Sequence, residues 1–356
     1  MRVKITKNQL TVILGMVWLI ASLLFTQFNG RFYQETLLKV LSVETTDRSD
    51  PSEEGRQEIT GRIQNGSHKG EIITFEAPTS YSQAVAPTYQ KGSQLFIDRS
   101  GGTVNVQSVK RDRYVLLLLG LFILLIWWVG KRQGIYSLMS VGLNISILLM
   151  AVATYVKWPQ IPLIAIMFVT GSLTTTLSLV LSTGWSKKTV ATVMATLGAS
   201  TIAWLVGWLV LTVFHDKGLR YEEMQFLTRP YRQIFIASLF LGTLGAAMDI
   251  AITVVSTIME LLEKNPAIST KQLIAAGQNV GKNVMGSMAS VLLFAYLSGG
   301  IPTIILYLKN GWDFGPTIEM TLSLEVARAL VGGIGIVLTI PLSVLVVALM
   351  SRKRGV

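Results

Sequence analysis

Long apolar segments follow one another over most of the chain, separated by short polar and basic loops. After a basic head, "LTVILGMVWLIASLLFTQF" is long enough to cross a bilayer, which takes about 20 apolar residues. Seven more apolar segments follow from Tyr114 onward, near residues 114–130, 136–156, 159–182, 188–214, 233–260, 284–308 and 322–350. This pattern predicts an α-helical polytopic membrane protein with about eight transmembrane helices.

Residues 29–112 have a different character, because they are polar and rich in Gly, Ser and Thr. Apolar and polar positions alternate in "EITGRIQNG", "GEIITFEA", "SQLFIDR" and "GTVNVQSVK", and Asn65-Gly66 is a typical turn pair. We therefore expect a small β-rich domain, an OB-like or SH3-like barrel. The predicted domains are an uncleaved signal-anchor helix (1–28), the β-rich domain (29–112) and a seven-helix transmembrane domain (113–356).

Composition agrees with a membrane protein and argues against several other classes. Hydrophobic residues make up 51% of the chain and charged residues only 14%, whereas soluble domains carry about 25% charge. The net charge of +11 comes from Lys and Arg in short loops and termini, so we expect no nucleic acid. The absence of cysteine and the two distant histidines make a metal site or cofactor unexpected. Without a phosphate loop, G-x-S-x-G or H-E-x-x-H, we expect no enzyme and no catalytic residue.

The distribution of positive charge predicts the orientation in the membrane. More Lys and Arg lie on the inside if the N-terminus is placed there. We therefore expect both termini in the cytoplasm and the β-rich domain on the extracytoplasmic side of the plasma membrane.

An aspartate interrupts the sixth predicted helix, in "GTLGAAMDIAITVVSTIMELLEKNP". Polar or small residues recur with it at steps of three or four, which places them on one face of a helix. This set is Gly242, Gly245, Asp249, Thr253, Ser256 and Glu260. Intramembrane polar groups face a bundle interior or a hydrated cavity, and glycines allow close helix packing. Asp249 therefore either hydrogen-bonds a neighbouring helix or takes up a proton or cation in a hydrated path, for which Thr253, Ser256 and Glu260 are the further candidates on this helix.

The seventh predicted helix repeats this design. Its polar face holds Asn279, Asn283, Gly286, Ser287 and Ser290, and it follows Gly277 and Gly281. The four-residue spacing of these two glycines is typical of helix packing. Alternatively, Asn283 and Ser290 line the same path as Asp249. The preceding "EKNPAISTKQLIAAGQ" is amphipathic and is expected to lie along the cytoplasmic surface.

Five further polar residues stand out. Glu325 and Arg328 are three apart at the start of the last helix, and we predict an interhelical ion pair that acts as a clamp more than as a transport site. Asn144 in the third helix needs a partner for its amide, which marks an inward face, and it is a further candidate for coordinating a substrate or lining a hydrated cleft. We assign Glu222 and Glu223 to a solvated amphipathic loop segment, because adjacent helical residues do not face the same way.

Four stretches resemble the YibE/F family of bacterial membrane proteins. They are "TGWSKKTVATVMATLG", "GTLGAAMDIAITVVSTIMELLEKNP", "GQNVGKNVMGSMASVLLFAYLSGGIPTIIL" and "EVARALVGGIGIVLTIPLSVLVVALM", and together they cover most of residues 110–350. The resemblance implies a multi-pass protein of the bacterial plasma membrane. It also implies a second family member, or another copy of the chain, as partner, and it implies no settled activity.

The last three predicted helices also look like part of SecD/SecF, the export subunits of the RND superfamily. Glycines and a membrane aspartate come first, and two helices with small residues follow. An outside domain between the first two helices is a shared trait. This likeness implies an RND/SecDF-like helix bundle and proton-driven export, although the chain has two more helices and a different spacing from glycine to aspartate.

Three hypotheses about function remain open. The first is a transporter or export-associated subunit that uses Asp249 as its proton or cation site. The second is a structural or assembly subunit of a membrane complex, in which Asp249 only holds helices together. The third is a surface receptor or sensor that binds a ligand through the β-rich domain. The partners expected in every case are the lipid bilayer and another subunit.

Overall fold

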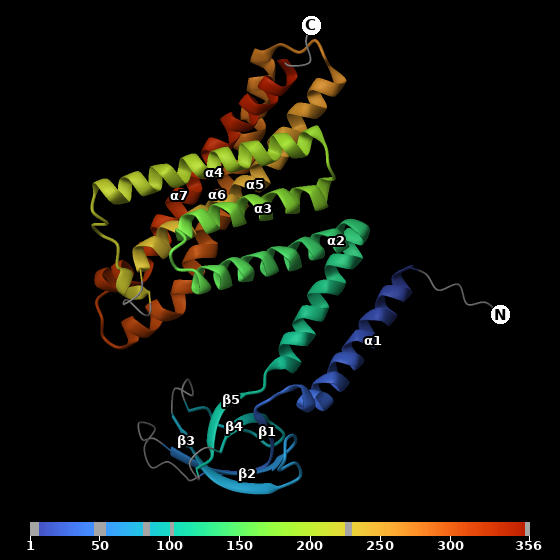
Figure 1. Cartoon of the computed structure of the whole chain (residues 1–356), viewed down its shortest axis with the longest axis vertical. Coiled ribbons are helices and arrows are strands. Elements are labelled where there is room, and N and C mark those ends of the chain that lie inside the picture. Colours follow the sequence, from blue (N-terminus) through green and yellow to red (C-terminus); the bar gives the residue numbers. More distant parts are fainter. Residues whose placement is uncertain (1–6, 46–54, 81–85, 100–102, 225–229, 353–356) are drawn as a thin grey trace, which may run out of the picture. The chain divides into compact units, whose positions relative to one another are not determined.

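The computed structural model describes residues 7–45, 55–80, 86–99, 103–224 and 230–352. The chain divides into two compact units, Met1–Gly134 and Ile135–Val356. Figure 1 shows the first unit in blue to teal colours and the second in green to red. Each unit has a core of its own.

The first unit contains two helical segments and a β-sheet. Helix α1 (Lys7–Phe28) leads through a 3-10 turn, η1 (Asn29–Phe32), into the sheet, and α2 (Asp112–Lys157) follows it. A Cβ atom on Gly120 of α2 would lie 1.6 Å from Nε1 of Trp18 on α1. The missing side chain at Gly120 therefore lets the indole of α1 pack directly against α2.

The sheet has five antiparallel strands in the order β3-β2-β1-β4-β5. They are β1 (Thr36–Thr45), β2 (Gly55–Ile63), β3 (Ile72–Thr79), β4 (Gln94–Asp98) and β5 (Asn105–Val109). The predicted small β-rich domain is confirmed. In the described strands it is a half-barrel and not a closed one, because β3 and β5 are edges that do not pair. Strand β1, which lies between β2 and β4, was not predicted.

Alternating apolar residues form the core of this sheet. Leu38 and Val40 of β1, Ile59 and Ile63 of β2 and Leu95 of β4 are almost completely buried. Successive residues of a strand point to opposite faces, so these side chains all lie on one face. The domain is thus held together by one apolar layer on the inside of the half-barrel.

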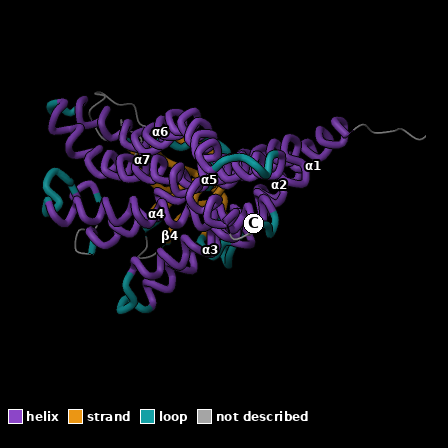
Figure 2. The backbone as a smooth tube through the Cα atoms, turned by 90° about the horizontal axis from the view of Figure 1, so that it is seen from above, coloured by secondary structure: helices purple, strands orange, loops and turns teal. Residues whose placement is uncertain are grey.

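The second unit is a helix bundle, seen from above in Figure 2. It contains the end of α2, then α3 (Leu163–Thr183), α4 (Lys187–Val213), the 3-10 turn η3 (Tyr221–Glu223), α5 (Tyr231–Lys264), α6 (Thr270–Lys309) and α7 (Phe314–Arg352). Helix α5 packs against α3, α4, α6 and α7, and α7 packs against α4, α5 and α6. Helix α5 is therefore an inner helix of the bundle.

Within the described residues, six helices are long and apolar enough to cross a membrane. The predicted number was about eight, and two features account for the difference. Helix α2 has 46 residues, about 70 Å of helix, and covers two predicted spans. Its backbone departs from helical geometry at Lys131 (φ 49°), where the sequence predicts a loop. The other feature is α1, which has 22 residues, but whose described side chains run only from Gly15 to Thr26, too few to count as a span.

The segment before the seventh predicted helix is itself helical from Thr270 onward and continuous with that helix, while its position along the cytoplasmic surface stays a prediction. Helix α6 already begins at Thr270 and runs without a break to Lys309. The reason is a capping box. The Ser269 hydroxyl accepts a hydrogen bond from the backbone N–H of Gln272, and the Gln272 side chain accepts one from the backbone N–H of Ser269.

Helix α4 carries a face made entirely of small residues. Ala191, Ala195, Ala199, Ala203 and Gly207 recur every four residues and are buried. A Cβ on Gly207 would lie 2.8 Å from a methyl group of Val331 on α7. Small residues at this spacing let two membrane helices approach closely. This face was not predicted, although the four-residue spacing of alanine was the signal for it.

Two glycines of α6 make a similar close contact. A Cβ on Gly277 would lie 2.5 Å from Val344, and one on Gly281 would lie 2.6 Å from Ile340. Both partners belong to α7. The two glycines therefore set the separation between α6 and α7.

Replacing Gly281 with leucine is expected to destabilise the bundle by about 1–3 kcal/mol, because the new side chain overlaps Ile340. Gly299→Leu is the matched control, since nothing lies within 4 Å of the Cβ position at Gly299 on the same helix. Thermal unfolding in detergent should show a lower Tm for the first variant only. Equal Tm values for the two variants would contradict this packing.

Candidate functional site

The polar residues of α5 lie on the side of the helix that its neighbours leave open. The opposite side is fully buried at Phe240, Ile250, Val254 and Ile258. By contrast, Gly245, Asp249 and Glu260 are exposed, and Gly242, Thr253 and Ser256 are half-buried. These six residues are called the Asp249 face below. They share one side of α5, as the spacing predicts.

Asp249 lies near the middle of its helix. It is 18 residues from Tyr231 and 15 from Lys264, so each end of α5 is more than about 20 Å away. Helix α5 contacts α6 both before and after Asp249. Before it, Gly242 faces the Tyr296 hydroxyl of α6; after it, Ile258 faces Gly277, which lies nearer the start of α6. Asp249 is therefore far from both ends of the span.

The carboxylate of Asp249 has no hydrogen bond and no ion pair in the described part of the chain. Only its backbone carbonyl is engaged, because it accepts a hydrogen bond of 2.8 Å from the Thr253 hydroxyl. One turn away, nothing lies within 4 Å of the position where a Cβ on Gly245 would be. The space beside the carboxylate is therefore open on the Gly245 side. A carboxylate in the middle of a membrane helix needs water, a cation, a proton or a partner.

The other end of the Asp249 face is an exposed charge network. Glu260 and Lys264 form an ion pair of 2.8 Å within α5, and Glu263 lies 3.7 Å from Lys188 of α4. The Glu260 carboxylate has its own cation and is exposed to solvent. Glu260 thus has a charged partner, whereas the Asp249 carboxylate has none among the described residues.

The polar residues of α6 do not bond to Asp249 in the described structure. Asn279, Asn283, Gly286, Ser287 and Ser290 are all exposed. The Ser287 and Ser290 hydroxyls donate to carbonyl groups of their own helix, at Val284 and Gly286. A Cβ on Gly286 would meet no atom within 4 Å. These residues therefore form an exposed polar surface on α6, in which the described structure gives the side chains of Asn279 and Asn283 no partner.

Asn144 has its partner on α3. Its Nδ2 donates a hydrogen bond of 2.6 Å to the Ser178 hydroxyl, which also accepts one from Ser140. The Oδ1 atom of Asn144 is buried without a partner. Asn144 thus ties α2 to α3, and no hydrogen bond among the described residues connects it with α5.

Glu325 and Arg328 form an ion pair, but it is not interhelical as predicted. Both residues belong to α7, where a spacing of three brings their side chains together. The link to other helices comes from aromatic rings. The Arg328 guanidinium lies 5.4 Å from the ring centre of Phe235 on α5 and 5.8 Å from that of Tyr296 on α6. Arg328 therefore joins three helices.

Glu223 of η3 belongs to the same group of side chains. The residue as a whole is exposed, which agrees with its assignment to a solvated segment. Its carboxyl group, however, is partly shielded from water by its neighbours. This desolvation and the charge of Glu325 raise the pKa of Glu223 to about 7, while Arg328 acts in the opposite direction. Glu223, Phe235, Tyr296, Glu325 and Arg328 are called the Arg328 cluster below.

Contact between η3 and α7 should weaken as pH rises from about 5 to about 7. The carboxyl of Glu223 keeps its proton to about pH 7 in the docked arrangement but loses it near 4.5 when free. Between pH 4.5 and pH 7 the docked form binds more protons than the undocked form, so the stability of the docked form falls as the pH rises. Above about pH 7 both forms are ionised and the stability no longer changes with pH. Hydrogen exchange of residues 219–224 should report this loosening. Glu223→Gln should remove the pH dependence and Glu222→Gln should keep it; equal behaviour of the two variants would contradict this assignment.

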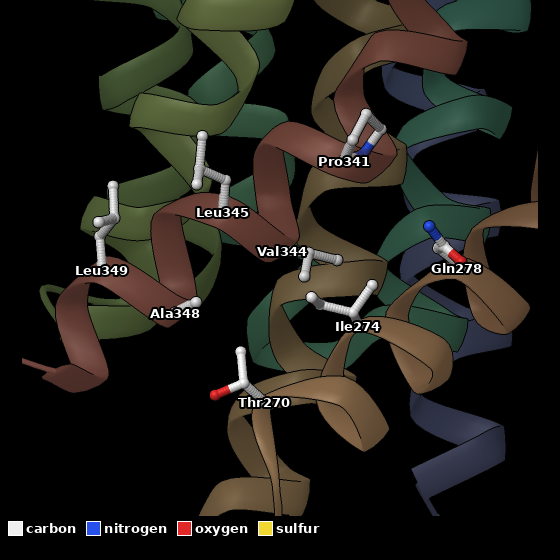
Figure 3. A pocket seen from close by; sticks show the side chains of 8 residues that line it. All are labelled: Thr270, Ile274, Gln278, Pro341, Val344, Leu345, Ala348 and Leu349. Atoms are coloured by element: carbon white, nitrogen blue, oxygen red, sulfur yellow. The ribbon is translucent and has the colours of Figure 1, made fainter.

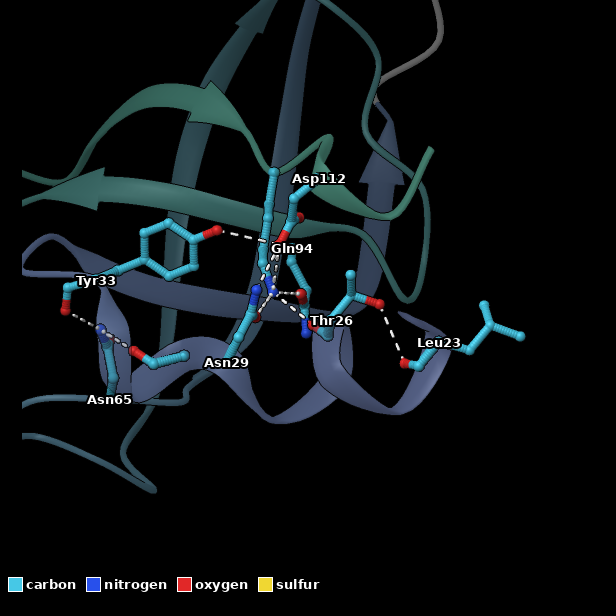
Figure 4. Close-up of polar contacts among 9 residues, drawn as sticks. Leu23, Thr26, Asn29, Tyr33, Asn65, Gln94 and Asp112 are labelled. Carbon is cyan, nitrogen blue, oxygen red and sulfur yellow. Dashed lines mark hydrogen bonds and ion pairs between the residues drawn. The ribbon is translucent and has the colours of Figure 1, made fainter. Parts of the chain in front are cut away.

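A second polar group, in the first unit, was not predicted. Lys110 is almost completely buried, and its ammonium donates to the Thr26 carbonyl (2.6 Å), Asn29 Oδ1 (2.5 Å) and Gln94 Oε1 (2.9 Å) (Figure 4). Asp112 lies 3.5 Å from the ammonium and accepts a hydrogen bond from Asn29. Lys110 thus connects the last turn of α1, strand β4 and the first residue of α2.

One cavity is built from residues that the sequence did not single out. It has a volume of about 410 Å³ and lies between α6 and α7 (Figure 3). Its lining residues are Thr270, Ile274, Gln278, Pro341, Val344, Leu345, Ala348 and Leu349. Most of them are apolar, and none belongs to the Asp249 face. Among the described residues, no group of three or more His, Cys, Asp or Glu is placed to hold a metal ion.

In the described parts of the chain, six apolar helices of membrane-spanning length and an antiparallel β domain indicate a multi-pass membrane protein. Residues 118–353 match the model of the YibE/F-like protein family, and residues 31–110 match that of the YibE/F family N-terminal domain. The chain therefore belongs to the YibE/F family. No curated protein and no solved structure matches it, so the likeness to SecD/SecF stays a prediction.

Proposed function

We propose that this protein is a transporter or export-associated subunit in which Asp249 binds and releases a proton or a cation. The observation that carries the proposal is a carboxylate in the middle of a membrane-length helix, open to space and without a partner in the described chain. A purely structural aspartate would be satisfied by hydrogen bonds from a neighbouring helix. The orientation that goes with this function has both termini in the cytoplasm and the β domain outside.

Carbodiimide chemistry tests this function directly. A hydrophobic carbodiimide reacts with a protonated carboxyl group in the membrane and leaves it as a stable acylurea, which mass spectrometry can locate. The full-length protein, reconstituted in nanodiscs, should be modified at Asp249, and modification should fall as the pH is raised. Protection by Na⁺ at constant pH would identify a cation as the ligand. Failure to modify Asp249 at any pH would overturn the proposal.

Two controls sharpen this experiment. Asp249→Asn should lose the modification, because an amide does not react in this way. Glu260 serves as an internal reference in the same molecule, since it is exposed and paired with Lys264. If Glu260 is modified in preference to Asp249, the reaction depends on how accessible a carboxyl group is from water and not on its protonation within the membrane.

The exposed polar surface also favours a second function, that of an assembly subunit. Gly245 of α5 and Gly286 of α6 have open space beside them, and Asn283 has an amide without a partner among the described residues. Open glycines and unpaired amides are suited to packing against another membrane helix. In this alternative a second YibE/F-family subunit, or another copy of the chain, covers Asp249. Loss of a co-purifying subunit in Asp249→Asn would support it.

A further inference from the structure

The Arg328 cluster lies at one end of the Asp249 face. Gly242 belongs to that face, and a Cβ on Gly242 would lie close to the Tyr296 hydroxyl and 3.9 Å from Cγ of Arg328. The absence of a side chain at Gly242 therefore brings Tyr296 and Arg328 against α5. Asp249 follows seven residues later on the same side, about two turns or 10 Å along the helix.

Part of the stretch of α5 between the cluster and Asp249 is open. Tyr296 and Arg328 lie against Gly242, whereas nothing lies within 4 Å of the position that a Cβ on Gly245 would take. The roughly 10 Å of helix from Gly242, which the Tyr296 hydroxyl faces, to Asp249 corresponds to about three waters in a hydrogen-bonded row. The Tyr296 hydroxyl, which can both donate and accept, lies at the start of this stretch.

The charges of the cluster are suited to taking up one proton. Glu223 and Glu325 supply two carboxylates and Arg328 one guanidinium, so the ionised cluster has one uncompensated negative charge. Binding one proton makes it neutral, which is favoured where water is partly excluded. The Nε atom of Arg328 is buried without a partner, so a hydrogen-bond donor remains available for a water or a carboxylate. No charged group of α3, α4 or α6 forms an ion pair with Asp249 in the described residues.

We propose that the Arg328 cluster is the proton uptake site of Asp249, reached from the side of the membrane that holds η3. This inference rests on the function proposed above. A proton from water binds the Glu223 carboxylate. It then leaves Glu223 and passes along the row of waters beside Tyr296 and Gly245, so that the O–H bond formed at Asp249 replaces the one broken at Glu223. No other group is oxidised or reduced.

A pH gradient across sealed membranes tests this route with the full-length chain. Right-side-out vesicles from expressing cells hold the protein in one orientation. Because the chain has no cysteine, Glu222→Cys and a membrane-impermeant maleimide identify the side that holds η3. A hydrophobic carbodiimide is then applied with about pH 6 on one side and about pH 8 on the other, a roughly hundredfold difference in proton concentration.

Modification of Asp249 should be several-fold greater when the acidic side is the η3 side than when the gradient is reversed. Glu223→Gln and Tyr296→Phe should bring this ratio close to one. Tyr296→Phe keeps the ring beneath Arg328 and removes only the hydroxyl. Glu222→Gln is the matched control: it removes a neighbouring exposed carboxylate and should leave the ratio unchanged.

The outcomes separate this route from the underlying function. If the modification of Asp249 depends on the pH of the compartment opposite η3, the proposed uptake site is wrong. The same conclusion holds if Glu223→Gln and Tyr296→Phe keep the wild-type ratio. In both cases the proton-binding function of Asp249 stands. If Asp249 is modified at no pH, the proposed function fails and the route fails with it.

Discussion

Replacing Lys110 with methionine is expected to destabilise the first unit by about 3–5 kcal/mol, a larger loss than that expected for Gly281→Leu. Methionine keeps most of the apolar length of lysine and removes the ammonium. The carbonyl of Thr26, the amide oxygen of Asn29 and the Gln94 side chain then lose a donor at once. Asp112 also loses its nearest cation in a site that is largely closed to water.

The loss of stability in Lys110→Met should appear at the junction of the β domain with its helices. Carbonyl groups in the last turn of a helix lack partners within the helix, and Lys110 supplies one for α1. Hydrogen exchange of strands β1 and β4 in the full-length protein should therefore accelerate in Lys110→Met. Lys91→Met is the control, since Lys91 is exposed. Equal exchange in the two variants would mean that the buried ammonium does not stabilise the domain.

Lys110 also illustrates what the sequence did not reveal. A lysine before a long apolar segment has the typical appearance of a residue at the membrane surface, and nothing local indicates that it is buried. Its partners Thr26 and Gln94 are distant in sequence, and they meet Lys110 only in the folded domain. Such a site depends on tertiary contacts that periodicity does not contain.

The helices were predicted better than the sheet, for a physical reason. Membrane helices satisfy their backbone hydrogen bonds locally, so length and hydropathy are enough to detect them. Strand β1 (Thr36–Thr45) is stabilised by partners on both sides, β2 and β4, that lie far along the chain. Its segment "TLLKVLSVET" has a weaker alternation than the four strands that were predicted.

The polar face of α5 could be predicted, and its surroundings could not. The spacing from Gly242 to Glu260 indicates one face of a helix regardless of what packs against it. Whether Asp249 has a partner depends on the placement of α3 and α6. The same holds for Glu223, which looks like an ordinary loop carboxylate until η3 is placed beside Glu325 and Arg328.

Asp249→Asn is expected to abolish function while the protein still folds and inserts normally. The side chain of Asp249 makes no hydrogen bond or ion pair in the described chain, so an amide of the same size removes no intramolecular contact there. We expect a change in unfolding free energy within about 0.5 kcal/mol, as for other substitutions outside the packed core. Asparagine cannot take up or release a proton near neutral pH, so any step that depends on this exchange stops.

Complementation of a deletion strain measures the functional part of this prediction, and thermal unfolding in detergent measures the structural part. Glu260→Gln is the control, because it removes a carboxylate from the same face where solvent and Lys264 already compensate it. A stable Asp249→Asn protein that complements fully would exclude a proton or cation role. A stable protein that fails to complement and also loses its partner subunit would place Asp249 in an interface. If Asp249→Asn is stable, keeps its partner subunit and still fails to complement, the result supports a titrating carboxylate. In that case the substitution has removed the ability to bind a proton and has left the assembly intact.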